Sequence, residues 1–137
     1  MLPMQKCLGA VEASVENVYV GRGVESIATL TDSNKVLAAL HSGDILLVDA
    51  ISLEITKRLI GHTKTVRSIA VSGDGLWMVS GSSDGTVRRW NVKTGSIIGP
   101  PLVDHKNTVT SVALSESGEV IVSGAWNGQI RVWSMKS

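Results

Sequence analysis

The sequence predicts an all-β fold made of repeated four-stranded antiparallel sheets, and three observations support this prediction. His62 and His105 are 43 residues apart, and Trp90 and Trp133 have the same separation, which indicates an internal repeat. Each period holds short apolar runs separated by turn residues such as Gly, Asp and Asn, as expected for hairpins. The 137 residues include no Phe, so the core must consist of Val, Ile, Leu and Ala, which suit strands.

The composition limits the class of protein and its partners. Hydrophobic residues make up 43% and charged residues 18%, which is typical of a folded globular chain. The net charge of +1 gives no strong basic field, so we expect no nucleic-acid partner. Cys7 is the only cysteine, which excludes an internal disulfide and a cysteine-based zinc site. No apolar run reaches the roughly 18–20 residues of a membrane span, and the N-terminus makes a poor secretory signal. We therefore expect a cytoplasmic protein without a membrane partner or a cofactor.

The repeat divides the chain into four expected segments. Residues 1–23 form an arm or an added strand, 24–61 a degenerate copy, 62–104 a full copy, and 105–137 a copy that lacks its own last strand. The expected strands cover 24–30, 35–40, 45–48 and 54–60, then 66–71, 76–80 and 86–91, then 109–114, 120–123 and 130–133. The fourth strand of the full copy is interrupted by Pro100 and Pro101, which cannot donate hydrogen bonds, so it must lie at an edge or carry a bulge.

The repeated phrases also carry a family resemblance. VSGSSDGTVRRWN and VSGAWNGQIRVWS, each preceded by a His and closed by a Trp within a period of about 40–45 residues, resemble the WD40 repeat. This resemblance implies a partial β-propeller of four-stranded antiparallel WD40 blades. The connector IIGPPLVDH in addition resembles those of fungal NACHT-type WD-repeat proteins.

The resemblance implies a buried chain of four hydrogen-bonded side chains in each good blade. The implied members are His62, Ser80, Asp84 and Trp90 in the second copy, and His105, Ser123, Asn127 and Trp133 in the third. A buried carboxylate is costly unless it is paired, and an imidazole can donate to it while accepting from a hydroxyl. Asn127 would keep a hydrogen bond and the turn but lose the charge. The matching first-copy positions fall near Val20, Ala38, Ser42 and Val48, so that blade must rely on apolar packing.

Several catalytic or binding interpretations compete with this structural one. Ser80, His62 and Asp84 could be taken for a hydrolytic triad, but no nucleophile elbow surrounds the serine. The GSSDG stretch at 81–85 lacks the Lys and helix of a phosphate-binding loop, so we interpret it as a hairpin turn. His41, His62 and His105 show no metal-ligand spacing, so we expect no metal site. Since no acids or bases cluster by spacing, we expect no enzyme.

The resemblance implies that partners bind at one rim of the propeller. The matching positions, called the rim residues below, are Thr65, Arg67 and Ser83 in the second copy and Thr108, Thr110 and Trp126 in the third. We expect a scaffold that binds a protein or peptide there, since exposed Trp and Arg are enriched in binding hot spots. Alternatively, Trp126 only covers a neighbouring blade, and the chain is a structural fragment with no partner of its own.

Three blades are fewer than the roughly 4–8 of a closed propeller. The outer faces would then be apolar and unpaired, which favours association. We therefore expect either a piece of a longer array or a possible homodimer with six blades. A strand at 15–20 could complete the last blade, in the same chain or in another.

Overall fold

The computed structural model describes residues 17–20, 23–30, 33–102 and 105–134, which form eleven strands in three antiparallel sheets. The first sheet contains β1 (Val24–Thr29), β2 (Lys35–Leu40), β3 (Ile45–Asp49) and β4 (Ile55–Leu59) in that order. The middle sheet contains β5 (Val66–Val71), β6 (Trp77–Ser82), β7 (Val87–Asn91) and β8 (Ser96–Ile97). The third sheet contains β9 (Val109–Leu114), β10 (Val120–Ala125) and β11 (Ile130–Ser134).

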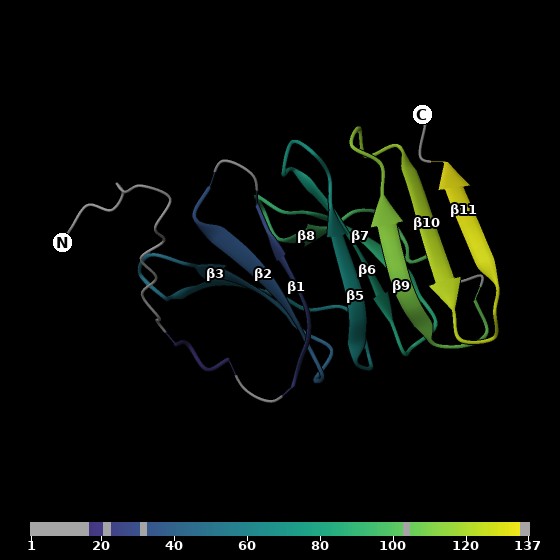
Figure 1. The fold of residues 1–137 in the computed structure, drawn as a ribbon, viewed down its shortest axis with the longest axis horizontal. Coiled ribbons are helices and arrows are strands. Elements are labelled where there is room, and N and C mark those ends of the chain that lie inside the picture. The colour runs from purple at the N-terminus through teal and green to yellow at the C-terminus, as the bar shows by residue number, and fades with distance from the viewer. Residues whose placement is uncertain (1–16, 21–22, 31–32, 103–104, 135–137) are drawn as a thin grey trace, which may run out of the picture.

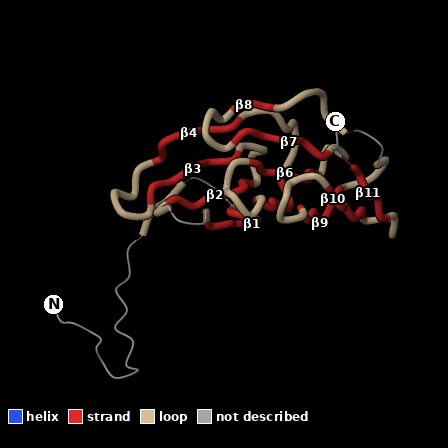
Figure 2. The backbone as a smooth tube through the Cα atoms, turned by 90° about the horizontal axis from the view of Figure 1, so that it is seen from above, coloured by secondary structure: helices blue, strands red, loops and turns tan. Residues whose placement is uncertain are grey.

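The three sheets stand side by side in chain order, with the first and third sheets at opposite ends of the molecule (Figure 1). Seen from above, β1 and β9 lie along one side, and β4 and β8 lie along the other (Figure 2). Each sheet therefore runs outward from its first strand as a blade does. The all-β fold of partial propeller blades predicted from the sequence is confirmed.

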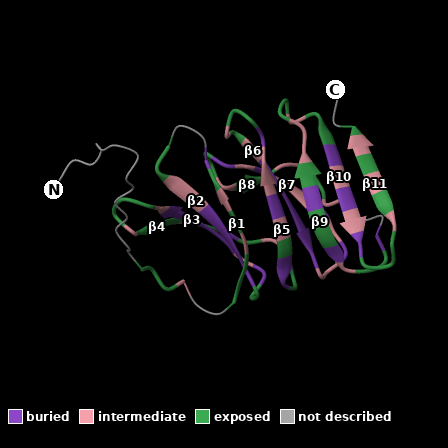
Figure 3. Cartoon of the chain, viewed as in Figure 1, coloured by how far each residue is buried: buried purple, intermediate pink, exposed green. Residues whose placement is uncertain are grey.

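The core lies between the sheets. Colouring by burial shows the buried stretches where neighbouring sheets meet (Figure 3). Two clusters fill these interfaces, one joining the first and middle sheets and one joining the middle and third. The first includes Leu37, Ile45, Leu47, Val66, Ile69, Met78 and Trp90, and the second includes Val79, Val87, Val109, Val112 and Ile121. Each such side chain contributes about 1.5–3 kcal/mol when fully buried, so contact between sheets holds the blades together.

Pro100 and Pro101 interrupt the last strand of the middle sheet, which lies at the sheet edge as predicted. β8 has only two residues and lies at the edge of the middle sheet. After Gly99, Pro100 and Pro101, the chain returns to the same sheet, where Leu102 pairs with Val87 in an isolated bridge. The interruption therefore splits the fourth strand without removing the cover over β7.

Several predicted strand ends differ from the observed ones. β6 and β10 run two residues further than expected, to Ser82 and Ala125, because the small residues continue the ladder: Gly81 pairs with Val87 and Gly124 with Ile130. The predicted fourth strand at 54–60 is shorter at both ends, and the third sheet has three described strands.

The N-terminal arm is described only in part. Residues 17–20 form no strand, so the expected strand at 15–20 is wrong over this part, while Val15 lies outside the described residues. Val20 instead packs against an apolar cluster of the first sheet. The described arm is therefore attached to the first sheet, at the end opposite to the third (Figure 1).

Candidate functional site

Four side chains of the middle sheet form one hydrogen-bonded chain. The Trp90 indole donates to Ser80 Oγ at 2.8 Å, and the same oxygen lies 2.6 Å from His62 Nε2. His62 Nδ1 lies 2.9 Å from Asp84 Oδ2. An ionised carboxylate can only accept, so Nδ1 carries the proton and Nε2 accepts from the serine hydroxyl. β6 supplies Ser80, β7 supplies Trp90, and the turn between these strands supplies Asp84.

The carboxylate of Asp84 is held by several further donors. Oδ2 accepts the Thr63 amide at 3.1 Å, and Oδ1 accepts the amide and the hydroxyl of Thr86 at 2.9 Å and 2.6 Å. Burial of Asp84 opposes ionisation, but the bonds from His62 and Thr86 outweigh it and hold the pKa of this carboxyl well below its usual range. The charge is therefore present at neutral pH and fully paired.

This group is built for structure rather than hydrolysis. Ser80 is fully buried, and its oxygen already has both an indole donor and an imidazole acceptor. A substrate carbonyl cannot reach a hydroxyl in that position, although a nucleophile must be exposed to its substrate. Gly81 and Ser82 end β6, and residues 83–85 form the hairpin turn, with a positive φ of 87° at Gly85, so the stretch 81–85 is no phosphate loop.

The third sheet holds three of its four implied members together. His105 Nε2 lies 2.7 Å from Ser123 Oγ, which also accepts the Trp133 indole at 3.1 Å. Asn127 does not join them. Its Oδ1 accepts the backbone amide of Gln129 inside its own turn, and its other terminal atom is an amide nitrogen, which can donate but not accept. His105 Nδ1 is buried with no hydrogen-bond partner in the described residues. Because Ser123 donates to Nε2, Nδ1 carries the proton and needs an acceptor, so loss of the second carboxylate oxygen opens the chain at this point.

The first sheet replaces the polar group with apolar side chains. Ala38 and Val48 occupy the positions of the buried serine and tryptophan, and they pack with Leu40 and Leu46. Val20, at the position of the histidine, packs against the same cluster. Apolar contact therefore takes the place of the buried hydrogen-bond chain in this sheet.

The rim residues lie at one edge of the sheets, but their exposure differs. Trp126 is 78% exposed, and its backbone amide donates to Thr108 O at 2.9 Å, which fixes the turn that presents the indole. Arg67 is exposed, and its Nε donates to Ser83 Oγ at 3.0 Å. Thr110 is exposed on β9. The indole and the guanidinium are thus both exposed to solvent at this edge.

Thr65 differs from the other rim residues because it is buried. Its hydroxyl donates to the backbone oxygen of His41 at 2.9 Å and therefore joins the middle sheet to the first. The expectation that Thr65 is open to a partner is corrected. Its β-hydroxyl serves the contact between sheets, which the repeat pattern alone could not reveal.

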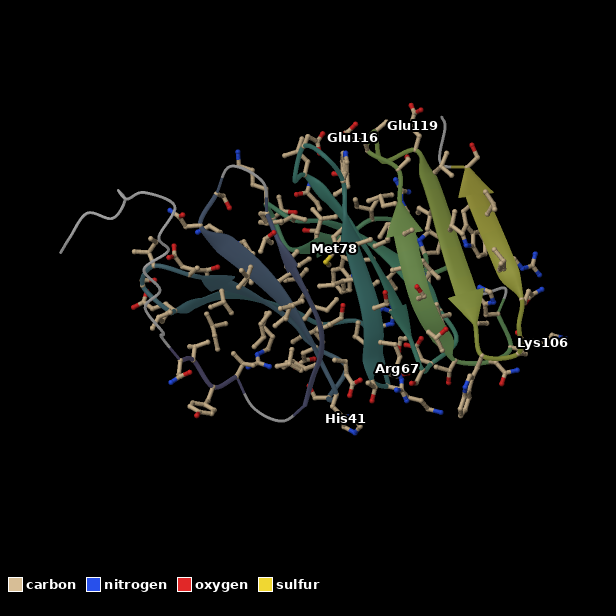
Figure 4. All side chains as sticks on the ribbon, viewed as in Figure 1. His41, Arg67, Met78, Lys106, Glu116 and Glu119 are labelled. Atoms are coloured by element: carbon tan, nitrogen blue, oxygen red, sulfur yellow. The ribbon has the colours of Figure 1, made fainter. Side chains whose placement is uncertain are left out.

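His41 belongs to this edge although the sequence interpretation did not include it. It precedes the turn of the first sheet as Ser83 and Trp126 precede theirs, so alignment of the turns would have found it. Its Nδ1 lies 3.7 Å from Glu25 Oε2, and Glu25 Oε1 lies 4.0 Å from an Arg67 guanidinium nitrogen. His41, Arg67 and Lys106 lie along one edge, whereas Glu116 and Glu119 lie at the opposite edge (Figure 4).

Metal and membrane features were also sought in the described residues. No group of three or more His, Cys, Asp or Glu side chains there is placed to hold a metal ion. The described part of the chain also holds no helix that could span a lipid bilayer.

A family model described as "WD domain, G-beta repeat" (WD40) matches residues 53–91 and 100–134. The U3 small nucleolar RNA-associated protein 21 homolog of Schizosaccharomyces pombe is 31% identical over 84 residues, which are 61% of this chain and 9% of that protein. U3 small nucleolar RNA-associated protein 21 of Saccharomyces cerevisiae is 35% identical over 60 residues, 44% of this chain and 6% of that protein. The ribosome biogenesis protein ERB1 of Debaryomyces hansenii is 51% identical over 35 residues, 26% of this chain and 4% of that protein. The chain spans less than a tenth of each of these relatives.

These names correct the cytoplasmic location expected from the sequence. Two of the relatives are named for a small nucleolar RNA and the third for ribosome biogenesis. The expectation rested only on a missing secretory signal, which separates secreted chains from the rest and does not distinguish compartments inside the cell.

Proposed function

This chain belongs to the WD40-repeat family, and we propose that it is a recognition module that binds a protein or peptide at the edge carrying Arg67 and Trp126. The observation that carries the proposal is the indole of Trp126, which is 78% exposed on a turn held by a backbone hydrogen bond. Trp and Arg supply a large share of the binding energy at protein interfaces when a partner removes them from water.

Charge at this edge indicates what the partner carries. Arg67 and Lys106 lie along it with His41, and the acidic Glu116 and Glu119 lie at the other edge (Figure 4). Glu25 neutralises part of this charge, because its carboxylate lies 4.0 Å from Arg67. A partner segment with an aromatic-accepting pocket and one or more carboxylates fits this surface, since a guanidinium binds carboxylates through paired N–H donors.

The setting of this binding follows from the relatives. Their names connect them with a small nucleolar RNA and with ribosome biogenesis, so we propose that the partner is a protein of a ribonucleoprotein assembly. The net charge of +1 argues for a protein surface rather than for direct RNA binding, because a strong basic field usually accompanies the latter. RNA binding is the second candidate, and the names of the relatives are the observation that favours it. The third candidate is a purely structural role, in which the chain only builds an assembly. It predicts no partner binding that depends on the rim residues.

The test is a double change, Trp126→Ala with Arg67→Ala, in a quantitative binding assay against proteins of purified pre-ribosomal particles. We expect affinity to fall at least about a hundredfold, since two hot-spot losses of about 2 kcal/mol each exceed that factor. The thermal unfolding midpoint should stay unchanged because both side chains are exposed.

The matched control changes one exposed aromatic and one exposed cation elsewhere, Tyr19→Ala with Lys93→Ala. Unchanged binding by the rim variant, or equal loss in the control, would refute the assignment of the rim. Binding that survives protein removal but falls steeply with salt and after ribonuclease treatment would favour RNA instead.

A further inference from the structure

The first strand of each sheet carries two apolar residues at equivalent positions. In two of the three sheets, the preceding sheet buries this pair. Val66 and Ile69 of β5 are 0% and 8% exposed, and both belong to the cluster shared with the first sheet. Val109 and Val112 of β9 are likewise buried, in the cluster shared with the middle sheet. These pairs are the contact that each blade makes with the blade before it.

The equivalent pair of the first sheet is uncovered. Val24 and Ile27 hold the same places in β1, since Ile27 pairs with Ala38 as Ile69 pairs with Ser80. They are 49% and 71% exposed. We call this surface the leading face.

The third sheet also presents the surface that receives such a pair, and no described residue covers it. Ile130 of β11 pairs with Gly124 as Val87 of β7 pairs with Gly81, yet Ile130 is 71% exposed and Val87 is fully buried. Val87 is covered by the following sheet and by the bridge to Leu102. We call the surface formed by Gly124, Ile130 and the neighbouring Val122 the trailing face.

The space around equivalent glycines shows that the trailing face has room for the first strand of another sheet. A Cβ added at Gly81 would meet Val109 Cγ1 at 2.6 Å and Val112 Cγ1 at 2.8 Å, so the next blade needs a glycine there. At Gly124, the glycine in the same place of the third sheet, such a Cβ would meet no atom of the described residues within 4 Å. The space that two valines fill between the middle and third sheets is therefore open beyond the third.

The turn glycines repeat this observation independently. A Cβ at Gly43 would meet backbone oxygens of His62 and Lys64 at 3.0 Å, and one at Gly85 would meet His105 O at 3.2 Å. Gly128 holds the same place in the third sheet, and a Cβ there would meet nothing within 4 Å in the part of the chain that the structure describes. Both strand and turn of the third sheet therefore carry the features that receive another blade.

We propose that the trailing face of one copy binds the leading face of a second copy, head to tail, and that two such contacts close a dimer of six blades. The leading and trailing faces lie at opposite ends of one molecule (Figure 1), so they cannot meet within one copy. Two copies supply six blades, which lies within the roughly 4–8 blades of closed propellers. A head-to-tail contact forms a ring when its rotation closes.

The seam has a predicted polar contact as well as an apolar one. Between the middle and third sheets, the Val112 amide donates to Ser68 Oγ at 3.1 Å. Ser111 is the matching serine of the third sheet, because it pairs with Gly124 as Ser68 pairs with Gly81, and it is exposed. In the dimer, the Ile27 amide of the second copy takes the place of the Val112 amide and donates to Ser111 Oγ.

The test measures molar mass by light scattering over a concentration series, with one charge placed on each face. The wild-type chain should reach twice its 14.5 kDa, while Ile27→Asp and Ile130→Asp should each raise the dissociation constant at least about tenfold. Ile51→Asp is the matched control, because Ile51 is 74% exposed and lies in a turn outside both faces.

An equimolar mixture of the two face variants separates head-to-tail contact from self-pairing of one face. Each variant alone has a damaged side in both contacts, whereas the mixed pair retains one undamaged contact and should regain dimer. A wild-type monomer, an assembly of another size, or a mixture that stays monomeric would overturn the proposal. Failure of the rim experiment would leave these results unaffected, because the rim residues belong to neither face.

Hydrogen exchange of the wild-type chain provides a second measurement in case a charged variant does not fold. Exchange should slow with rising concentration in β1 and in β10–β11 together, since these strands carry the two faces. Protection of only one of them, or of neither, contradicts a head-to-tail dimer.

Discussion

Removal of one hydroxyl, Ser80→Ala, should destabilise the protein far more than the size of the change suggests. Ser80 Oγ accepts from the Trp90 indole at 2.8 Å and lies 2.6 Å from His62 Nε2, and all three groups are buried. The substitution leaves one donor and one acceptor without partners in the core. Each unsatisfied group costs about 1–3 kcal/mol, so the free energy of unfolding should fall by about 2–6 kcal/mol. That is a large share of the roughly 5–15 kcal/mol of a typical domain.

The third sheet contains its own control for this change. Ser123→Ala removes the same hydroxyl, but Trp133 is only half-buried, its bond is 3.1 Å long, and His105 Nδ1 already lacks a partner in the described residues. We expect a loss of about 1–2 kcal/mol there.

Urea unfolding at pH 7, followed by tryptophan fluorescence and by hydrogen exchange of each sheet, measures both losses. A loss of unfolding free energy below about 1 kcal/mol for Ser80→Ala would refute this prediction, since even one buried group without a hydrogen-bond partner costs that much. Equal losses for the two serines would refute it as well, because the closed and opened hydrogen-bond chains would then be energetically alike.

Two further predictions concern the carboxylate position of the same chain. The pKa of Asp84 is lowered in the folded state, so the stability that its carboxylate contributes is present above the unfolded pKa of about 3.9 and is lost as the pH falls below that value. The difference in unfolding free energy between wild type and Asp84→Asn should therefore narrow from pH 5 to pH 2. A difference that widens over this range in urea titrations contradicts the prediction. Asn127→Asp should stabilise the third sheet by about 1 kcal/mol, because a carboxylate there can accept from His105 Nδ1, which has no partner in the described residues. An unchanged or lower unfolding midpoint in denaturant would show that the new carboxylate bonds within its turn and not to the histidine ring.

The blade fold was predictable because the sequence patterns that specify it are local. Hairpin turns, apolar runs and a fixed period each need only a short window of sequence, and the observed sheets follow them. The hydrogen-bond chain of the middle sheet could also be placed, since its members occupy the implied positions and meet at bonding distance. The segment boundaries at 23, 61 and 104 stay predictions.

What the sequence did not reveal depends on contacts between sheets. The repeat pattern predicts Thr65 as a rim residue, but its hydroxyl donates to the backbone oxygen of His41 in the neighbouring sheet. Asn127 keeps the turn bond through Oδ1, but its amide nitrogen cannot accept from the histidine 22 positions earlier, so the hydrogen-bond chain stays open. Strand ends were misplaced at Gly81 and Gly124 because glycine usually signals a turn, whereas here both glycines continue the ladder. At Gly81 the missing side chain also makes room for two valines of the next sheet.

The most direct test of the account is exchange of the four indole protons, followed by NMR of labelled protein. The Trp90 Nε1 proton should exchange at least about a hundredfold more slowly than that of Trp126, because the first is buried and bonded while the second is exposed. Ser80→Ala should remove most of that protection. Equal rates for Trp90 and Trp126 in the wild-type chain would contradict the buried chain of hydrogen bonds on which the blade depends.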